Sequence, residues 1–212
     1  EERFSLTRQH YATPYGLLPT PGDLVDKLAC AIGAEDAFLG ELHHRGEHSI
    51  ELAAVWLHHL RQGRPVEMLP VLTGSFSSFI QSGTDPAKDP AIRRFLDALH
   101  SAAQGRQVLY VAAADLAHVG PAFGGAPVDD SAQAALQAAD GELLEAIAAG
   151  QASSFIASLQ RVQDRHNVCG IAPIYLTLAA LAPCRGQTLA YGHCPADSAG
   201  KSLVSICGTL LY

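Results

Sequence analysis

The feature that most constrains the fold is a run of apolar residues at positions 108–114 that ends at Asp115. No polar side chain interrupts this run, as is typical of a strand covered on both faces of a sheet. In open α/β sheets, ligands bind in the crevice beyond the carboxyl ends of the strands. The sequence therefore predicts a central strand over 108–114, with functional side chains just after it at Asp115 and His118.

Helical segments are expected on both sides of this strand. Pro21 and Gly33 bound the first of them, since proline favours the first helical turn and glycine the residue after the last. Further helices are predicted over 48–63, 90–103, 131–149, 153–164 and 172–183, with a break near Gly141 in the fourth of the six. Strands are predicted at 66–72, 188–192 and 203–212. This order predicts a single layered α/β domain over residues 1–212, with a central mixed sheet flanked by helices.

The net charge of −7 argues against a nucleic-acid partner, because such proteins present a basic face. No stretch approaches the ~20 apolar residues of a membrane span. The first residues are polar, so no signal peptide is expected, and the odd count of five cysteines fits a reducing compartment. These observations predict a cytoplasmic protein without nucleic-acid or membrane partners.

His48 is expected just inside the start of a helix, between Glu47 and Ser49. The positive end of the helix dipole favours neutral imidazole there, which is the form that binds metals or accepts protons. The alternative is a histidine that caps the helix or is partly buried. His58 and His59, near the end of the same helix, are expected on the surface as partners of the dipole.

Two later segments carry similar chemistry. Asp115 is close enough along the chain to orient His118, although the aspartate can equally cap the next turn beside a solvated histidine. Cys169 precedes a predicted helix, where a thiol is more often thiolate and can bind a metal or act as a nucleophile. The alternative for Cys169 is a small buried hydrophobic residue. Asn167, close to Cys169, can support that site or simply end the preceding helix.

Several motifs occur in the order found in the Memo family, the mediator-of-cell-motility proteins and their prokaryotic relatives, which this chain therefore resembles. The motifs are Thr13-Pro14-Tyr15-Gly16, Glu47-His48-Ser49-Ile50-Glu51, Pro70-Val71-Leu72-Thr73-Gly74, Asp115-Leu116-Ala117-His118-Val119-Gly120, Asn167-Val168-Cys169-Gly170-Ile171-Ala172-Pro173-Ile174 and Val204-Ser205-Ile206-Cys207-Gly208. Each motif alone is weakly specific, but together they cover nearly all of the chain.

The resemblance implies a fold similar to that of the class III extradiol dioxygenases, non-haem iron enzymes that open catechol rings with dioxygen. It implies that His48 and Cys169 bind a metal together with a histidine from an N-terminal Pro-His-Ala-Gly-like motif. That motif and the family's first strand are expected before Glu1, so residues 1–212 are predicted to lack them. His118 corresponds to the acid–base histidine of the dioxygenases, with Asp115 beside it.

The resemblance also implies that Glu47 and Asn167 lie next to the metal ligands and orient them. The family's cysteine stands where the dioxygenases have a carboxylate ligand, which makes the ligand set softer and suits iron or copper. The expected function is a metal-dependent redox or dioxygenase-like protein with a small-molecule or peptide ligand in its cleft. Alternatives are a non-enzymatic adaptor that binds a peptide or protein in the same cleft, and a partner in a radical-enzyme pathway. Whether the chain is an enzyme, and its oligomeric state, are left open by the sequence.

Overall fold

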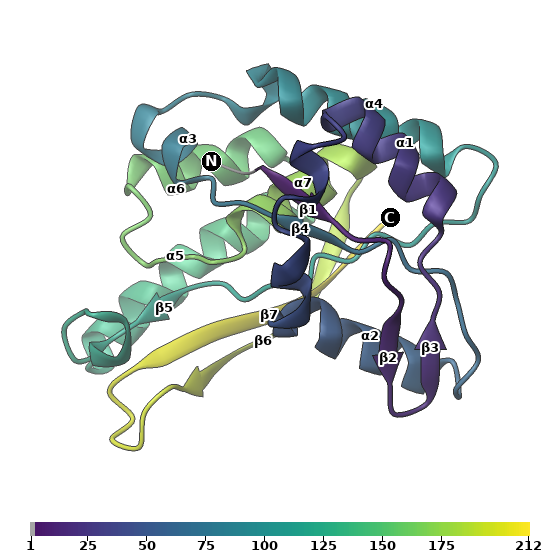
Figure 1. Cartoon of the computed structure of the whole chain (residues 1–212). Coiled ribbons are helices and arrows are strands. Elements are labelled where there is room, and N and C mark those ends of the chain that lie inside the picture. The colour runs from purple at the N-terminus through teal and green to yellow at the C-terminus, as the bar shows by residue number, and fades with distance from the viewer. Residues whose placement is uncertain (1–2) are drawn as a thin grey trace. The chain divides into compact units, whose positions relative to one another are not determined.

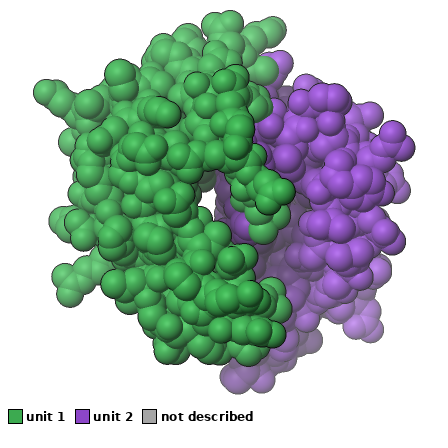
Figure 2. Space-filling model, turned by 90° about the vertical axis from the view of Figure 1, so that its right-hand side faces the viewer, with its two compact units in different colours: residues 1–75, 87–109 green, residues 76–86, 110–212 purple. Residues whose placement is uncertain are grey.

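The computed structural model of the chain describes residues 3–212. They form two compact units (Figure 2). Unit 1 contains the residues up to 75 together with 87–109, and unit 2 contains 76–86 and 110–212. A single domain over residues 1–212 stays a prediction, and the two units are described separately. No helix among the described residues is long and apolar enough to cross a membrane.

Unit 1 combines two small antiparallel sheets with helices. Its elements are β1 (Phe4–Leu6), β2 (Tyr11–Thr13), β3 (Gly16–Leu18), α1 (Gly22–Ile32), the 3-10 helices η1 (Asp36–Phe38) and η2 (Glu41–Arg45), α2 (His48–Leu60), β4 (Val71–Thr73) and α4 (Pro90–Ala103). Strand β1 pairs with β4, and β2 pairs with β3 (Figure 1). Helix α1 packs on α4, and the rings of Phe4 and Phe95 stack with centroids 4.0 Å apart.

The helix ends in unit 1 follow the local sequence. Pro21 is the N-cap residue of α1, and Gly33 ends the helix with a positive φ of 108°. Asp89 caps α4 by accepting hydrogen bonds from the backbone N–H groups of Ala91 and Ile92. The predicted helices over 21–33 and 90–103 are therefore confirmed.

His58 does not lie on the surface as predicted, because it is only 1% exposed. Its Nε2 lies 2.9 Å from the carbonyl oxygen of Gly63, which can only accept, so Nε2 carries the proton. Its Nδ1 therefore accepts from the hydroxyl of Thr13, 2.7 Å away. His58 thus ties helix α2 to the β2–β3 hairpin, which lies far from it in the sequence.

Replacing His58 with leucine is expected to lower the free energy of unfolding by about 1–3 kcal/mol, because the two hydrogen bonds of the buried imidazole, to Thr13 and Gly63, are lost. Urea unfolding of His58→Leu against wild type measures this loss. The adjacent, exposed His59 provides the control, and His59→Leu should change stability by less than about 0.5 kcal/mol. Equal losses in the two variants would show that the buried hydrogen bonds of His58 contribute little.

Unit 2 packs helices against one three-stranded antiparallel sheet. Its elements are α3 (Ser77–Ser82), β5 (His118–Val119), the 3-10 helix η4 (Pro121–Phe123), α5 (Asp130–Ala148), α6 (Ala152–Arg161), α7 (Ile171–Leu181), β6 (Gly186–Pro195) and β7 (Leu203–Leu211). The strand order is β5-β7-β6, and α5 packs against both β6 and β7 (Figure 1). Helix α5 continues through Gly141, so the predicted break does not occur.

The predicted central strand over 108–114 is wrong. These residues form no strand, and Val108, Leu109 and Val111 are 48%, 72% and 60% exposed. In place of one central mixed sheet, the described part of the chain has three small antiparallel sheets. An apolar run indicates a tendency to be buried, but a strand also needs a neighbour for its N–H and C=O groups. Here the backbone hydrogen bonds to β7 begin only at Leu116, and the paired strand β5 covers only His118–Val119.

A buried carboxylate lies between α5 and the β6–β7 hairpin. Asp140 is 1% exposed, and its Oδ2 accepts a hydrogen bond of 2.7 Å from the hydroxyl of Tyr191. The same hydroxyl oxygen lies 2.9 Å from Nε2 of His193. Burial, followed by the hydrogen bond to Asp140, raises the pKa of Tyr191, which keeps the phenol protonated as a donor. This network fixes α5 on the sheet.

Replacing Tyr191 with phenylalanine is expected to lower the free energy of unfolding by about 2–3 kcal/mol, because the buried carboxylate of Asp140 loses its donor. The matched control is Tyr212→Phe, since Tyr212 is 70% exposed. Urea unfolding should leave this control within about 0.5 kcal/mol of wild type. A Tyr191→Phe variant as stable as the control would contradict a stabilising role for the network.

Candidate metal centre

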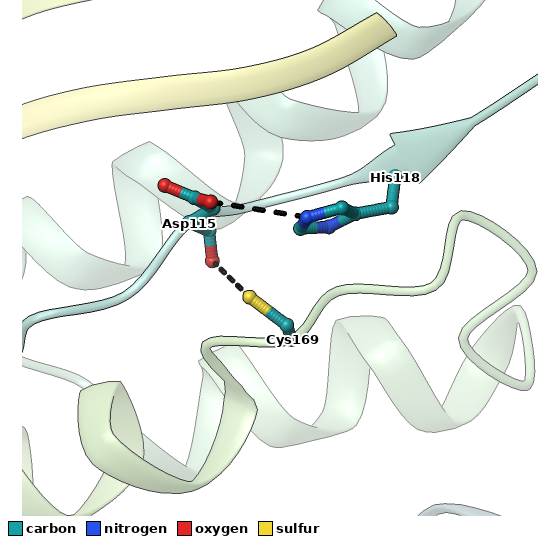
Figure 3. Close-up of side chains that lie close together, drawn as sticks. All are labelled: Asp115, His118 and Cys169. Carbon is teal, nitrogen blue, oxygen red and sulfur yellow. Dashed lines mark hydrogen bonds and ion pairs between the residues drawn. The ribbon is translucent and has the colours of Figure 1, made fainter. Parts of the chain in front are cut away.

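Three side chains that carry metal-binding atoms converge in unit 2. They are Asp115, His118 and Cys169, and one ligand atom from each lies within 4.8 Å of the others (Figure 3). Asp115 precedes strand β5, His118 is its first residue, and Cys169 lies just before the N-cap Gly170 of helix α7. Segments more than fifty residues apart in the sequence thus build one cluster.

Strand β7 fixes one side of the segment that carries Asp115 and His118. The backbone N–H of Leu116 donates to the carbonyl of Ser205 at 2.9 Å, and the N–H of Ser205 donates to the carbonyl of Ala117 at 2.9 Å. The buried hydroxyl of Ser205 also accepts from the N–H of Ala117 at 2.9 Å. His118 continues this register opposite Val204. The backbone between the two candidate ligands is therefore held in place.

The turn before α7 fixes the other side of the same segment. The N–H of Cys169 donates to the carbonyl of Leu116 at 3.3 Å, and the N–H of Gly170 donates to that of Asp115 at 3.1 Å. A Cβ atom on Gly170 would lie 2.5 Å from the carbonyl oxygen of Asp115. Only glycine therefore allows the two backbones to approach this closely.

The hydrogen bonds of His118 determine which ring nitrogen faces the cluster. Its Nδ1 lies 3.3 Å from the carbonyl oxygen of Leu116, which can only accept, so Nδ1 carries a proton. Its Nε2 faces Oδ2 of Asp115 at 3.8 Å. In neutral imidazole protonated at Nδ1, Nε2 carries the lone pair and faces the carboxylate, so a metal ion between the two atoms can bind both.

The cluster is open to solvent. The side chain of Asp115 is 45% exposed, that of His118 is 17% exposed, and Cys169 is exposed. The Sγ atom of Cys169 lies 3.6 Å from the carbonyl oxygen of Asp115. The ring of Phe123 packs edge-on against that of His118, with centroids 5.0 Å apart. The phenyl ring thus shields the imidazole, while the carboxylate and the sulfur are accessible to a ligand.

The other predicted site residues in the N-terminal half, Glu47 and His48, belong to unit 1. Glu47 is the N-cap of α2, and its Oε1 accepts from the N–H of Ser49 at 2.8 Å. This hydrogen bond is the main cause that lowers the pKa of Glu47. His48 begins the helix as predicted, with its side chain 79% exposed and its Nδ1 3.4 Å from Glu47 Oε1. Metal binding by His48 stays a prediction.

Asn167 has a structural role in the turn that carries Cys169. It adopts a left-handed φ of 53°, and its N–H donates to the carbonyl of Asp164 at 2.9 Å. Support of the metal ligand by the Asn167 side chain stays a prediction. The adjacent His166 contributes a group that the sequence did not indicate: its carbonyl accepts a hydrogen bond of 2.9 Å from the N–H of His118.

The fold and the cluster define a mixed α/β protein with a His/Cys/Asp group that can hold a metal ion. Residues 1–209 match the Memo family, described as Memo-like protein, and the chain therefore belongs to that family. The resemblance inferred from the ordered motifs is thus confirmed. The comparison with curated proteins gave no match.

Proposed function

We propose that this chain is a metal-dependent redox protein whose ion is held by Asp115, His118 and Cys169. The observation that carries the proposal is the convergence of a carboxylate, an imidazole and a thiol within 4.8 Å. A lone pair of His118 and the charge of Asp115 face each other at 3.8 Å, which a cation at that position would compensate.

The donor atoms fit iron or copper better than a hard cation. Magnesium and calcium prefer oxygen ligands, whereas this cluster offers one oxygen, one nitrogen and one sulfur. A bound iron or copper ion would supply one-electron chemistry, as expected of a fold similar to that of the extradiol dioxygenases. Metal binding by His48, which the Memo pattern implies, stays a prediction. These features favour a metal site over a cluster of side chains that only stabilises the fold.

The chain's own groups have distinct roles in this proposal. Asp115 balances positive charge in the cluster. The bond from Nδ1 of His118 to the carbonyl of Leu116 fixes the tautomer, so that Nε2 is free to donate its lone pair or to hold a proton. Cys169 brings the soft donor, and its exposure admits a small-molecule or peptide ligand. Phe123 keeps water from one edge of the imidazole.

The position of Nε2 allows His118 to be a metal ligand or the acid–base group expected from the dioxygenases. Metal content and oxygen consumption with catechol-like compounds distinguish these roles in His118→Ala. Loss of both indicates a ligand, whereas retained metal with lost turnover indicates an acid–base role. The exposed His43 provides the control, and His43→Ala should behave as wild type.

The experiment can also reject the proposal. Wild-type protein that binds neither iron nor copper in stoichiometric amount would contradict a redox function. Stoichiometric metal without oxygen consumption, together with peptide binding that depends on His118 and Cys169, would favour the non-enzymatic adaptor.

A further inference from the structure

We propose that Asp164 is a positioning residue that holds the turn between α6 and α7 in the shape that presents Cys169 to the cluster. This inference rests on the proposed metal function. The turn serves two of the three candidate ligands in unit 2, Cys169 and His118. It carries Cys169 itself, and the carbonyl of His166 accepts the backbone N–H of His118 at 2.9 Å. The shape of one short segment therefore fixes the distance between sulfur and imidazole.

The backbone of this turn is unusual. Gln163, Asp164 and Asn167 have left-handed φ angles of 52°, 47° and 53°. Residues other than glycine rarely adopt this conformation, although aspartate and asparagine tolerate it best. Such residues persist where surrounding contacts determine the backbone, and they are frequent at functional sites. The contacts that hold the turn are thus the ones that set the geometry of the cluster.

Asp164 supplies three of these contacts. Its N–H donates to the carbonyl of Leu159 at 3.0 Å, and its carbonyl accepts from the N–H of Asn167 at 2.9 Å. Its carboxylate oxygen Oδ1 accepts from the N–H of Val168 at 2.9 Å. Val168 is 4% exposed and directly precedes Cys169. The side chain of Asp164 thus satisfies a backbone donor one residue before the candidate ligand.

A different residue fastens the beginning of the turn. The side-chain amide of Gln163 donates to the carbonyl of Ile80 at 3.1 Å and to that of Gln160 at 2.9 Å. These bonds anchor the turn to α3 and α6, but they do not reach the half that carries Cys169. Loss of the Asp164 side chain would therefore leave the beginning of the turn in place and release the end with the sulfur.

Three variants test this role. Asp164→Ala removes the acceptor for Val168, whereas Asp164→Asn keeps an acceptor oxygen and tolerates the left-handed backbone. The matched control is Asp197→Ala, because Asp197 closes another turn of the same unit, accepting from the N–H groups of Ala199 at 2.9 Å and Lys201 at 3.0 Å. Each variant is titrated with Co²⁺, whose absorption reports a bond to sulfur, and its unfolding by urea is measured in parallel.

Asp164→Ala is expected to weaken Co²⁺ binding at least about tenfold and to reduce the sulfur-to-cobalt absorption, as is typical when a group that orients a ligand is lost. Asp164→Asn should restore affinity to within about threefold of wild type, and Asp197→Ala should stay within the same range. Equal losses of affinity in Asp164→Ala and Asp197→Ala would mean that both variants act by destabilising the protein as a whole. This result would overturn the proposal. So would an Asp164→Ala variant that binds Co²⁺ as tightly as wild type.

The alkylation rate of Cys169 in metal-free protein separates this inference from the metal function. Iodoacetamide labelling, followed by peptide mapping, measures Cys169 against the exposed Cys30 of α1 as an internal reference. Asp164→Ala should change the rate at Cys169 by more than about threefold, while Asp164→Asn and Asp197→Ala leave it near the wild-type value. If wild type binds no Co²⁺, the proposed metal function is contradicted, but the alkylation rates still test whether Asp164 positions Cys169. An unchanged rate at Cys169 in Asp164→Ala would refute this positioning role.

Discussion

Replacing Cys169 with alanine is expected to lower the affinity of the protein for ferrous or cuprous ion by about 100-fold or more, while the fold is retained. The expectation follows because the thiol is the only soft donor in the Asp115, His118 and Cys169 cluster. The side chain is exposed, so its removal leaves no cavity in the core. Competition with a chelator of known affinity measures the loss, and circular dichroism checks the fold.

A neighbouring cysteine provides the control for this prediction. Cys194 is also exposed and lies on β6 of the same unit. Cys194→Ala should bind the metal as wild type does. If Cys169→Ala retained its full affinity for the metal, or if both variants lost affinity equally, the assignment of the Cys169 Sγ atom as a ligand would be wrong.

The second large effect is expected from Gly170→Ala. The added methyl group would lie 2.5 Å from the carbonyl oxygen of Asp115 and 2.9 Å from Cδ1 of Ile174. Because the first of these atoms belongs to the backbone, it cannot rotate away. The variant should lose about 1–3 kcal/mol in its free energy of unfolding, as is usual for overpacking. It should also bind metal more weakly, since the Asp115 and Cys169 segments are pushed apart.

Gly141 offers a matched control, because nothing lies within 4 Å of a Cβ atom added there. It lies in the interior of α5, where alanine is a better helix former, so Gly141→Ala should stabilise the protein by about 0.5–1 kcal/mol. Urea unfolding compares the two variants. Gly170→Ala with wild-type stability and wild-type metal affinity would show that the close approach at residue 170 is not required.

The parts of the structure that the sequence predicts are those set by local chemistry. Asp89 and Pro90 define the start of α4, and Gly33 defines the end of α1, through interactions within a few residues. The position of Cys169 before α7 follows from the same kind of signal. For these reasons the end of α1, the start of α4 and the start of α7 were predictable.

The parts that could not be predicted depend on partners remote in the sequence. The apolar run over 108–114 resembles a buried strand, but pairing with β7 begins only at residues 116–119. His58 lies in the interior with its Nδ1 against the hydroxyl of Thr13, 45 residues away in the sequence, and no local pattern indicates this contact. The left-handed conformations of Asp164 and Asn167 have only a weak signal in the sequence, since aspartate and asparagine tolerate this backbone better than most residues.

X-ray absorption spectroscopy at the metal edge of iron- or copper-loaded protein tests the central claim most directly. A centre built by Asp115, His118 and Cys169 should show one sulfur scatterer together with nitrogen or oxygen. The sulfur signal should vanish in Cys169→Ser, and the imidazole signal should weaken in His118→Ala. A bound ion surrounded by nitrogen and oxygen alone, with a spectrum unchanged in both variants, would contradict the account.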